Sequence, residues 1–344
     1  MHMADALLSP PVAATMAAAS AVTAGYCVNT VRKENTAEKI PVMAVSAALV
    51  FAGQMINYTI PGTGSSGHIC GGMLLSALLG PQAGFLSMIT VLTIQCLFFA
   101  DGGLMALGAN IWNMAFYGCF VGYYFFWRPI VRGKIFGSLS VPLRITLAAV
   151  LGSVISLQLG ALSVVLETTL SGITELPFGA FAGLMLPIHL AIGLVEGLVT
   201  AAILVFVYHA RPELLMDVQN AGKGGAFSLK QTIAILAAVT VLIGGGLSLY
   251  ASSNPDGLEW ALFGNAEEGY AENMGLNEDN YGSTSAVADG AAGIQEATSF
   301  LPDYAFKGND SALGTTVSGI VGSGIVALCA FGIARLVRTK EKEA

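Results

Sequence analysis

The feature that most constrains this chain is a series of long apolar runs. A helix needs about 20 mostly apolar residues to cross the hydrocarbon core of a bilayer, and only 11% of the 344 residues are charged, against roughly 25% in a soluble domain. The run 69–80 is short and rich in glycine, so we expect a broken or tilted segment there. We predict an all-α integral membrane protein with nine spans, near residues 10–30, 40–58, 69–80, 83–100, 103–127, 142–165, 178–208, 229–251 and 315–337.

The basic residues indicate how the chain is oriented. Every Lys and Arg except Lys307 falls in one of the segments 32–39, 128–144, 211–230 and 335–342. Positive residues close to span ends stay on the cytoplasmic side, and nine spans put all four segments on one side. We therefore expect an extracytoplasmic N-terminus and a cytoplasmic C-terminus, with the loops 59–68 and 252–314 outside.

The net charge of −7 has a local origin. The outer loop 252–314 holds eleven acidic side chains and a single Lys. We expect a solvated loop, although an acidic loop can also concentrate cations weakly. Since this segment faces outward, no nucleic-acid partner is implied.

Two of the four histidines, His2 and His68, are predicted to lie outside. No Lys or Arg precedes Arg32, and Asp5 interrupts the apolar stretch, so the start does not have the pattern of a secretory signal. We therefore expect Met1 to remain at the start of the chain.

A free amine followed by His at position 2 can chelate a metal. The Met1 amine, the His2 amide and the His2 imidazole Nδ1 are joined by short covalent paths, which place three nitrogens in one plane once the amide proton has left. His68 can supply the fourth nitrogen. A square of nitrogens suits Ni(II) and Cu(II), with Co(II) possible, and suits tetrahedral Zn(II) poorly. Against this stands the ordinary interpretation, in which a terminal His is disordered and a loop His is solvated.

Ionisable and polar residues inside the membrane are costly and are functional candidates. His189 and Glu196 lie seven residues apart in the run 178–208, which places them on one helical face about two turns apart. Asp101 occupies the turn before the run 103–127, and Asn110 and Asn113 follow on one face. These residues either hold helices together by hydrogen bonds or support the metal ligands and line a passage for the ion.

Two motifs are absent from the sequence. No G-x-x-x-x-G-K-[ST] loop occurs, so we expect no ATP hydrolysis by this chain. No H-E-x-x-H occurs, which disfavours an intramembrane zinc protease.

Four stretches resemble one family. They are MHMADALLSP at 1–10, PGTGSSGH at 61–68, DGGLMALGAN at 101–110, and the stretch from His189 to Gly197. They resemble, in order, motifs of the CbiM/NikM family, the substrate-specific (S) components of energy-coupling factor (ECF) transporters for cobalt and nickel.

The resemblance implies a seven-helix S-component bundle in a bacterial cytoplasmic membrane. It also implies a transported Ni²⁺ or Co²⁺ ion held by Met1, His2 and His68, without an organic cofactor. The implied partners are a CbiQ/NikQ-like transmembrane coupling protein and a CbiO/NikO-like ATPase. The resemblance gives no role for Asp101, His189 or Glu196, and the sequence does not choose between nickel and cobalt.

A second resemblance lies in NPDGLEW at 254–260. It is similar to the PDGLE domain, related to the small CbiN/NikN subunits, which have two spans joined by an outer loop. We therefore expect a metal-binding membrane domain at 1–210, a cytoplasmic linker at 211–228, and a two-span unit at 229–344 that carries the acidic loop.

Three other functions remain open. The chain could be an autonomous transition-metal channel or carrier that needs no ATPase. It could be a membrane enzyme using His189 and Glu196 as acid and base. It could be an S-component for an organic vitamin, in which case His2 would be dispensable.

Overall fold

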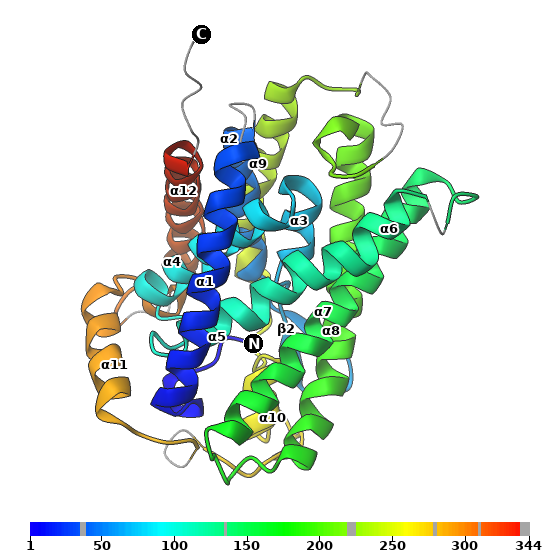
Figure 1. Ribbon diagram of the computed structural model, residues 1–344. Coiled ribbons are helices and arrows are strands. Elements are labelled where there is room, and N and C mark those ends of the chain that lie inside the picture. Colours follow the sequence, from blue (N-terminus) through cyan, green and yellow to red (C-terminus); the bar gives the residue numbers. More distant parts are fainter. Residues whose placement is uncertain (35–38, 134–135, 219–224, 278–280, 309–310, 338–344) are drawn as a thin grey trace.

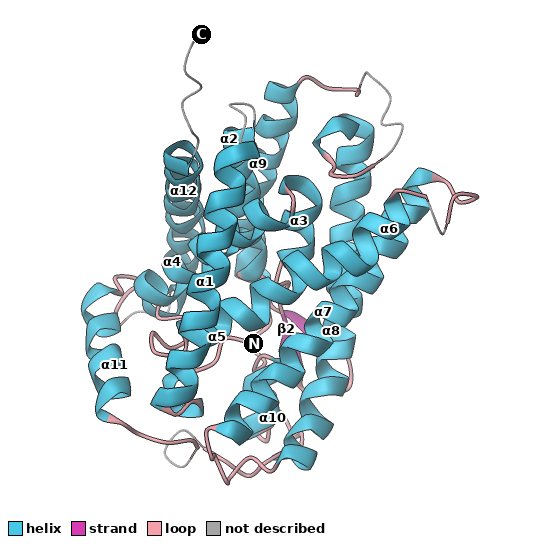
Figure 2. Cartoon of the chain, viewed as in Figure 1, coloured by secondary structure: helices cyan, strands magenta, loops and turns pink. Residues whose placement is uncertain are grey.

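The structure, a computed structural model, describes residues 1–34, 39–133, 136–218, 225–277, 281–308 and 311–337. Within these ranges the chain is helical apart from loops and one small hairpin (Figure 2). The predicted all-α membrane fold is confirmed.

The first 210 residues are the larger of the two units that the sequence predicts. In its described part, seven helical segments follow in order if the run 107–131 counts as one, as the resemblance implies. This run consists of α5, a π-helical segment η2 and α6, which continue without a break. The helices are α1 (Pro10–Glu34), α2 (Lys39–Gln54), α3 (Gly72–Leu79), α4 (Pro81–Phe99), α5 (Leu107–Ile111), η2 (Trp112–Trp127), α6 (Arg128–Val131), α7 (Val141–Leu170) and α8 (Phe178–Ala210).

The second unit contains two long helices and the loop between them. It consists of α9 (Leu229–Gly245), η4 (Leu247–Tyr250), α10 (Gly257–Phe263), α11 (Ala286–Thr298), η5 (Pro302–Tyr304) and α12 (Ala312–Val337), and the short 3-10 turn η3 (Pro212–Leu214) precedes it. Helices α9 and α12 pack on each other and on α2. The backbones of Gly244 and Gly319 meet where α9 and α12 cross, which is the close approach that small residues permit between membrane helices.

Six helices in the described ranges are long and apolar enough to cross a membrane: 10–33, 81–99, 141–170, 178–210, 229–250 and 312–337. Of the other predicted spans, 40–58 corresponds to the shorter apolar helix α2, which ends at Gln54, and 103–127 corresponds to the helical run 107–131, which begins four residues later. The run 69–80 is the eight-residue α3, too short to cross alone. The backbone explains why α3 begins and ends where it does. Gly71 and Gly80, which flank it, have φ near +84° and +86°, and Pro81 is the first residue of α4.

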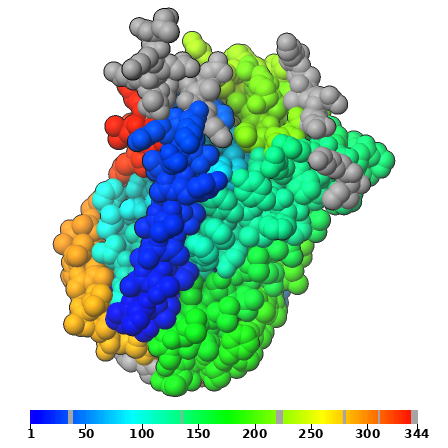
Figure 3. All heavy atoms as spheres, viewed as in Figure 1, coloured from blue at the N-terminus to red at the C-terminus, as the bar shows by residue number. Residues whose placement is uncertain are grey.

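The surface of the long helices fits a lipid environment. Large apolar side chains such as Leu166, Leu194, Leu242 and Leu328 are exposed along α7, α8, α9 and α12. Helix α1 lies on the outside of the bundle from end to end (Figure 3). The chain is therefore a multi-pass membrane protein.

The predicted loop 59–68 contains the hairpin. Strand β1 (Tyr58–Ile60) pairs antiparallel with β2 (Ser65–Gly67), with Thr59 opposite Ser66. The hairpin, α10 and the start of the chain lie close together in the same half of the molecule (Figure 1). Helix α12 ends at the opposite end, so the acidic loop and the last helical turn are on different sides of the bundle.

Candidate metal centre at the chain start

The first residues are held inside the protein by backbone hydrogen bonds. Met3 is fully buried. Its N–H donates to the Asn110 side-chain oxygen at 2.7 Å, and its carbonyl accepts from the Asn110 amide at 3.1 Å and from the Gly103 N–H at 2.9 Å. One asparagine thus pairs with both backbone groups of Met3, as a neighbouring strand would. The predicted candidate Asn110 therefore fixes the segment that carries Met1 and His2.

The turn 101–103 needs its glycines because the first residues of the chain pack directly against its backbone. Gly102 has φ near +77°, and a Cβ there would lie 3.2 Å from the His2 Cβ. A Cβ at Gly103 would overlap Asp5, whose carboxylate accepts from the Ala106 N–H at 2.9 Å. The DGGL stretch recognised in the sequence is thus the surface on which the chain start lies.

His68 follows β2 directly and is 8% exposed. Its Nδ1 lies 3.1 Å from the Ile69 carbonyl oxygen. A carbonyl only accepts, so Nδ1 carries the proton and Nε2 carries a free lone pair. Nε2 is the atom that a metal needs.

Glu196 anchors the residues that follow His68. Its two oxygens accept the backbone N–H groups of Cys70 at 2.7 Å and Gly71 at 3.1 Å, and Gln54 donates to the Cys70 carbonyl at 2.7 Å. A buried carboxylate on α8 therefore sets the backbone path of the 69–71 segment.

The predicted ligands come together. The rings of His2 and His68 stack with centroids 5.4 Å apart and an interplanar angle of 24°. The Met1 side chain is 2% exposed, and the Met1 amine donates to Asp256 Oδ2 at 3.0 Å. The same oxygen lies 3.9 Å from His68 Nε2. The amine and both imidazoles therefore surround one small region, where the two ordinary interpretations predicted a disordered end and a solvated loop.

Burial and neighbouring charge set the protonation of these groups. Burial lowers the pKa of the Met1 amino group, but the Asp256 carboxylate outweighs it and the net pKa is raised. Burial would raise the pKa of Asp256, but the charge of the Met1 ammonium and its hydrogen bond to the carboxylate hold that pKa well below its usual range. Burial, the Met1 ammonium and His2 lower the pKa of His68 to about 4. The metal-free centre is thus an ammonium–carboxylate pair beside a neutral His68.

His2 differs in one respect from the predicted chelate. The chelate uses Nδ1, but here Nδ1 lies 3.1 Å from Asp101 Oδ1, while Nε2 is buried without a hydrogen-bond partner. Asp101 also accepts from the Tyr304 hydroxyl. A half turn of the imidazole about its Cβ–Cγ bond brings Nδ1 to the other side, so metal chelation requires that the ring turn away from Asp101.

No group of three or more His, Cys, Asp or Glu side chains that could hold a metal ion occurs in the described ranges. The predicted ligand set does not need such a group. Two of its four nitrogens, the Met1 amine and the His2 amide, belong to the backbone.

Two further candidates from the sequence, His189 and Asn113, lie near the centre but are not predicted ligands. His189 is buried on α8, with Nδ1 2.8 Å from the Met185 carbonyl oxygen. It lines a hollow of about 10 Å³ together with Met1, His68 and Asp256. Asn113, one turn beyond Asn110, donates to Glu167 on α7 at 2.8 Å.

The sequence analysis missed Asp256 as a member of the centre. The one local signal was Asp at 256 with Glu at 259, and the structure shows a capping box there at the start of α10. Nothing in the sequence indicated that residue 256 contacts residue 1.

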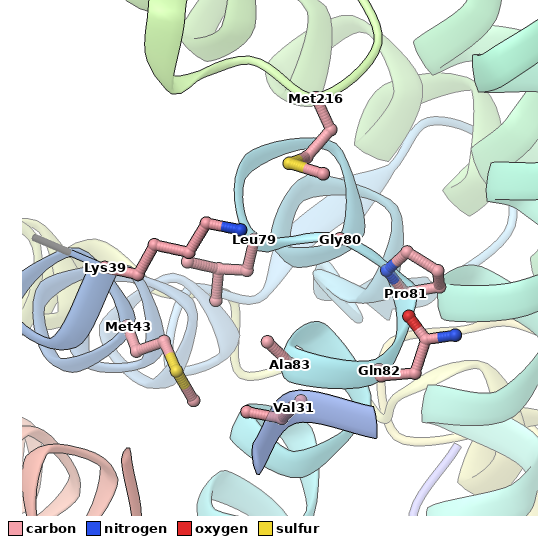
Figure 4. A pocket seen from close by; sticks show the side chains of 9 residues that line it. All are labelled: Val31, Lys39, Met43, Leu79, Gly80, Pro81, Gln82, Ala83 and Met216. Carbon is pink, nitrogen blue, oxygen red and sulfur yellow. The ribbon is translucent and has the colours of Figure 1, made fainter. Parts of the chain in front are cut away.

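A separate hollow of about 40 Å³ lies near the other end of α1 (Figure 4). It is not a cation site, because its only charged lining residue is a lysine and it has no carboxylate or imidazole. Its lining residues are Val31, Lys39, Met43, Leu79, Gly80, Pro81, Gln82, Ala83 and Met216.

Comparison with known proteins decides the family. Residues 2–214 match the model of the CbiM family, described as the cobalt uptake substrate-specific transmembrane region. The chain belongs to the CbiM family. Residues 230–339 of this CbiM-family protein match the PDGLE domain, so both resemblances seen in the sequence are confirmed.

Individual relatives of this chain are also described as metal transport proteins. A putative fused nickel transport protein NikMN of Archaeoglobus fulgidus is 35% identical, over 98% of this chain and all of its own length. A cobalt transport protein CbiM of Sorangium cellulosum is 32% identical, over 55% of this chain and 81% of its own. A solved structure described as a truncated transition metal transporter is 31% identical and covers 60% of this chain and 98% of its own, with a TM-score of 0.51.

Proposed function

We propose that this CbiM-family chain is the ion-capturing membrane subunit of an ECF-type ABC importer for Ni²⁺ or Co²⁺. Its relatives are named as nickel and cobalt transport proteins, and the chain is a membrane component of such transport. The observation that carries the finer proposal is the convergence of the buried Met1 amine, His2 and His68.

The chemistry of capture follows from these nitrogens. The Met1 ammonium loses a proton and the His2 amide loses another. The His2 imidazole turns from Asp101, and its proton moves from Nδ1 to Nε2, so that Nδ1 has a lone pair for the ion. With His68 Nε2 these atoms form a square of nitrogens around the ion, which suits Ni(II) and admits Co(II). Because the chain start is already held by Asn110, little further ordering opposes binding.

The topology belongs to the same proposal. We infer an extracytoplasmic N-terminus and a cytoplasmic C-terminus in a bacterial cytoplasmic membrane, with domains at 1–210 and 229–344 joined by a cytoplasmic linker at 211–228. Part of that linker lies outside the described residues. The position of the acidic loop, at the end of the bundle opposite the end of α12, supports this orientation (Figure 1).

Transport requires partners in this proposal. A CbiQ/NikQ-like coupling protein and a CbiO/NikO-like ATPase would supply the motion that opens the centre inward. In a cell that expresses all subunits, uptake of ⁶³Ni or ⁵⁷Co is expected to cease when the ATPase genes are removed. Undiminished uptake would favour the autonomous carrier instead.

Ion capture itself is tested on the purified chain. Titration with Ni²⁺ and Co²⁺ is expected to show one tight site, which His2→Ala and His68→Ala remove. The exposed His209 on α8 supplies the matched control, since His209→Ala leaves the site intact. The enzyme alternative receives no support, because both oxygens of Glu196 already accept backbone N–H groups.

A further inference from the structure

The start of the linker after α8 crosses the ends of other helices. Met216 lies at the junction of α3 and α4, over Gly80 (Figure 4). Its N–H donates to the Ala77 carbonyl oxygen of α3 at 2.8 Å, and its own carbonyl oxygen accepts from the Trp127 indole of η2 at 2.9 Å. The backbone of one linker residue thus joins α3 to the end of η2.

Helix α3 depends on this bond at its last turn. In a continuing α-helix the Ala77 carbonyl would accept from the N–H group four residues later, but that residue is Pro81, which has no N–H. Ala77 is fully buried, and a buried carbonyl without a donor is costly. The Met216 N–H therefore supplies, from outside the helix, a donor that α3 cannot supply itself.

Asp217 fastens the same segment to the end of the run 107–131. Its Oδ2 accepts from the Tyr123 hydroxyl at 2.7 Å, and its Oδ1 accepts from Arg132 Nε at 3.1 Å and Nη2 at 2.5 Å. Arg128 Nε lies 3.4 Å from Oδ2. The Asp217 side chain is 16% exposed, so these contacts are partly shielded from water. We call Met216 and Asp217 together the latch.

The other end of α3 leads to the metal centre. Two residues separate His68 from Gly71, which precedes the helix, and Glu196 holds this connection through the N–H groups of Cys70 and Gly71. Gly71 and Gly80, on either side of α3, both have positive φ, and glycine is the residue at which a backbone changes direction most readily. A helix of eight residues is about 12 Å long and can move as one piece between two such points.

The position of the latch agrees with release of the ion to the cytoplasm. The end of α8, from which the linker starts, and the end of α12 lie at the same end of the bundle (Figure 1), which the proposed topology places inside the cell. The chain start and the hairpin lie in the other half. Helix α3 therefore connects a contact on the inner side with a ligand on the outer side.

We propose that the latch controls release of the bound ion. While Met216 and Asp217 hold α3, His68 stays in the metal centre; when the latch opens, α3 moves and withdraws His68 from the ion. This inference rests on the proposed function, because it takes His68 to be a ligand. Asp217 is then a positioning residue that acts on the ion through α3.

The test measures how fast bound Ni²⁺ leaves the protein. Asp217→Asn removes the charge that pairs with Arg132 and keeps the shape, since Asn also tolerates the positive φ of residue 217. The matched control is Glu213→Gln, which removes a carboxylate of the same linker whose partner, Arg211, is only two residues away. Ni²⁺-loaded protein in detergent is mixed with excess chelator, and the decay of the Ni²⁺ absorption band gives the dissociation rate.

We expect Ni²⁺ to leave Asp217→Asn about ten-fold faster than the wild type, because charged hydrogen bonds that keep the latch closed are lost. The absorption band itself should not change, since the ligands are the same. Tyr123→Phe removes one hydroxyl from the opposite side of the latch and should also speed dissociation, by about three-fold. Glu213→Gln should match the wild type. A merely structural role of Asp217 would lower the unfolding temperature and leave the dissociation rate unchanged.

Coupling between the latch and the centre must also act in reverse. Ni²⁺ bound at His68 should therefore slow hydrogen exchange in the peptide 212–218, which contains the Met216 N–H, as measured by mass spectrometry. In His68→Ala, Ni²⁺ at a saturating concentration should not slow this exchange, because the ion no longer bonds to the segment that leads into α3.

The possible failures differ from one another. Wild-type dissociation rates in both Asp217→Asn and Tyr123→Phe would overturn the latch, and so would exchange in 212–218 that Ni²⁺ does not alter in the wild type. Equal acceleration in Glu213→Gln would also overturn it, since any loss of charge from the linker would then suffice. All three results leave the proposed function standing. No tight binding of Ni²⁺ or Co²⁺ by the wild type would overturn both. If Asp217→Asn does not fold, Tyr123→Phe gives the same comparison.

Discussion

Replacing His68 by Ala removes one of the four nitrogens and leaves the chain start intact. Asn110 still holds the backbone of Met3, so the nitrogens of Met1 and His2 remain in place and water takes the fourth position. Changes to residues that only support a metal ligand already cost 10- to 100-fold in affinity, so we expect a loss of at least about 100-fold, or roughly 2.7 kcal/mol. The lost ring stack with His2 costs about 0.5–1.5 kcal/mol of folding stability, too little to unfold the protein.

The assay for this variant is competition with a chelator of known affinity, together with a thermal melt. The exposed His209 is the control, because His209→Ala removes an imidazole of the same type from outside the centre. Wild-type affinity within about three-fold for His68→Ala would refute the reasoning. Loss of binding in both variants would show that the effect is not specific to the centre.

Three other predictions concern the surroundings of the centre. Asn110→Ala leaves the buried Met3 N–H without an acceptor, which should cost about 1–3 kcal/mol in chemical unfolding and weaken metal binding; an unaltered unfolding midpoint would contradict this. Binding releases one proton from the Met1 ammonium and one from the next backbone amide. Burial lowers the pKa of that ammonium, but Asp256 opposes this and the net pKa is raised, so the amine carries its proton until a metal binds. The metal-bound state therefore holds fewer protons, and affinity should rise with pH with a slope near two in log K. Calorimetry in buffers of different ionisation enthalpy counts the protons, and a count of zero would be inconsistent with the chelate. Glu196→Gln presents an NH₂ group to one of the two backbone N–H groups it now accepts, so Ni²⁺ affinity measured by titration should fall about 10- to 100-fold, whereas unchanged affinity would remove its positioning role.

Much of the fold could be predicted because membrane helices have a strong local signal. The runs at 142–165, 178–208 and 315–337 became α7, α8 and α12 with shifts only at their ends. The short run 69–80 was flagged by its glycines, and Gly71 and Gly80 do end α3 through positive φ. The hairpin β1–β2 was not predicted, because three-residue strands have no periodicity to detect.

Only part of the metal centre could be predicted from the sequence. Met1, His2 and His68 were predicted because an amine and a second-position imidazole are linked covalently, so their geometry follows from the chain. Asp256 was missed because its role depends on a contact across 255 positions. The pairing of His2 Nδ1 with Asp101 was also beyond the sequence, since it depends on how the 101–103 turn packs on the chain start.

The central claim is that the first two residues and His68 hold the ion through nitrogen alone. X-ray absorption spectroscopy of the Ni²⁺-loaded protein tests it most directly, because it reports ligand number, geometry and imidazole rings. We predict a four-coordinate planar site of nitrogen ligands with two imidazoles, and one imidazole fewer in His68→Ala. A six-coordinate site of oxygen ligands, unchanged in that variant, would contradict the account.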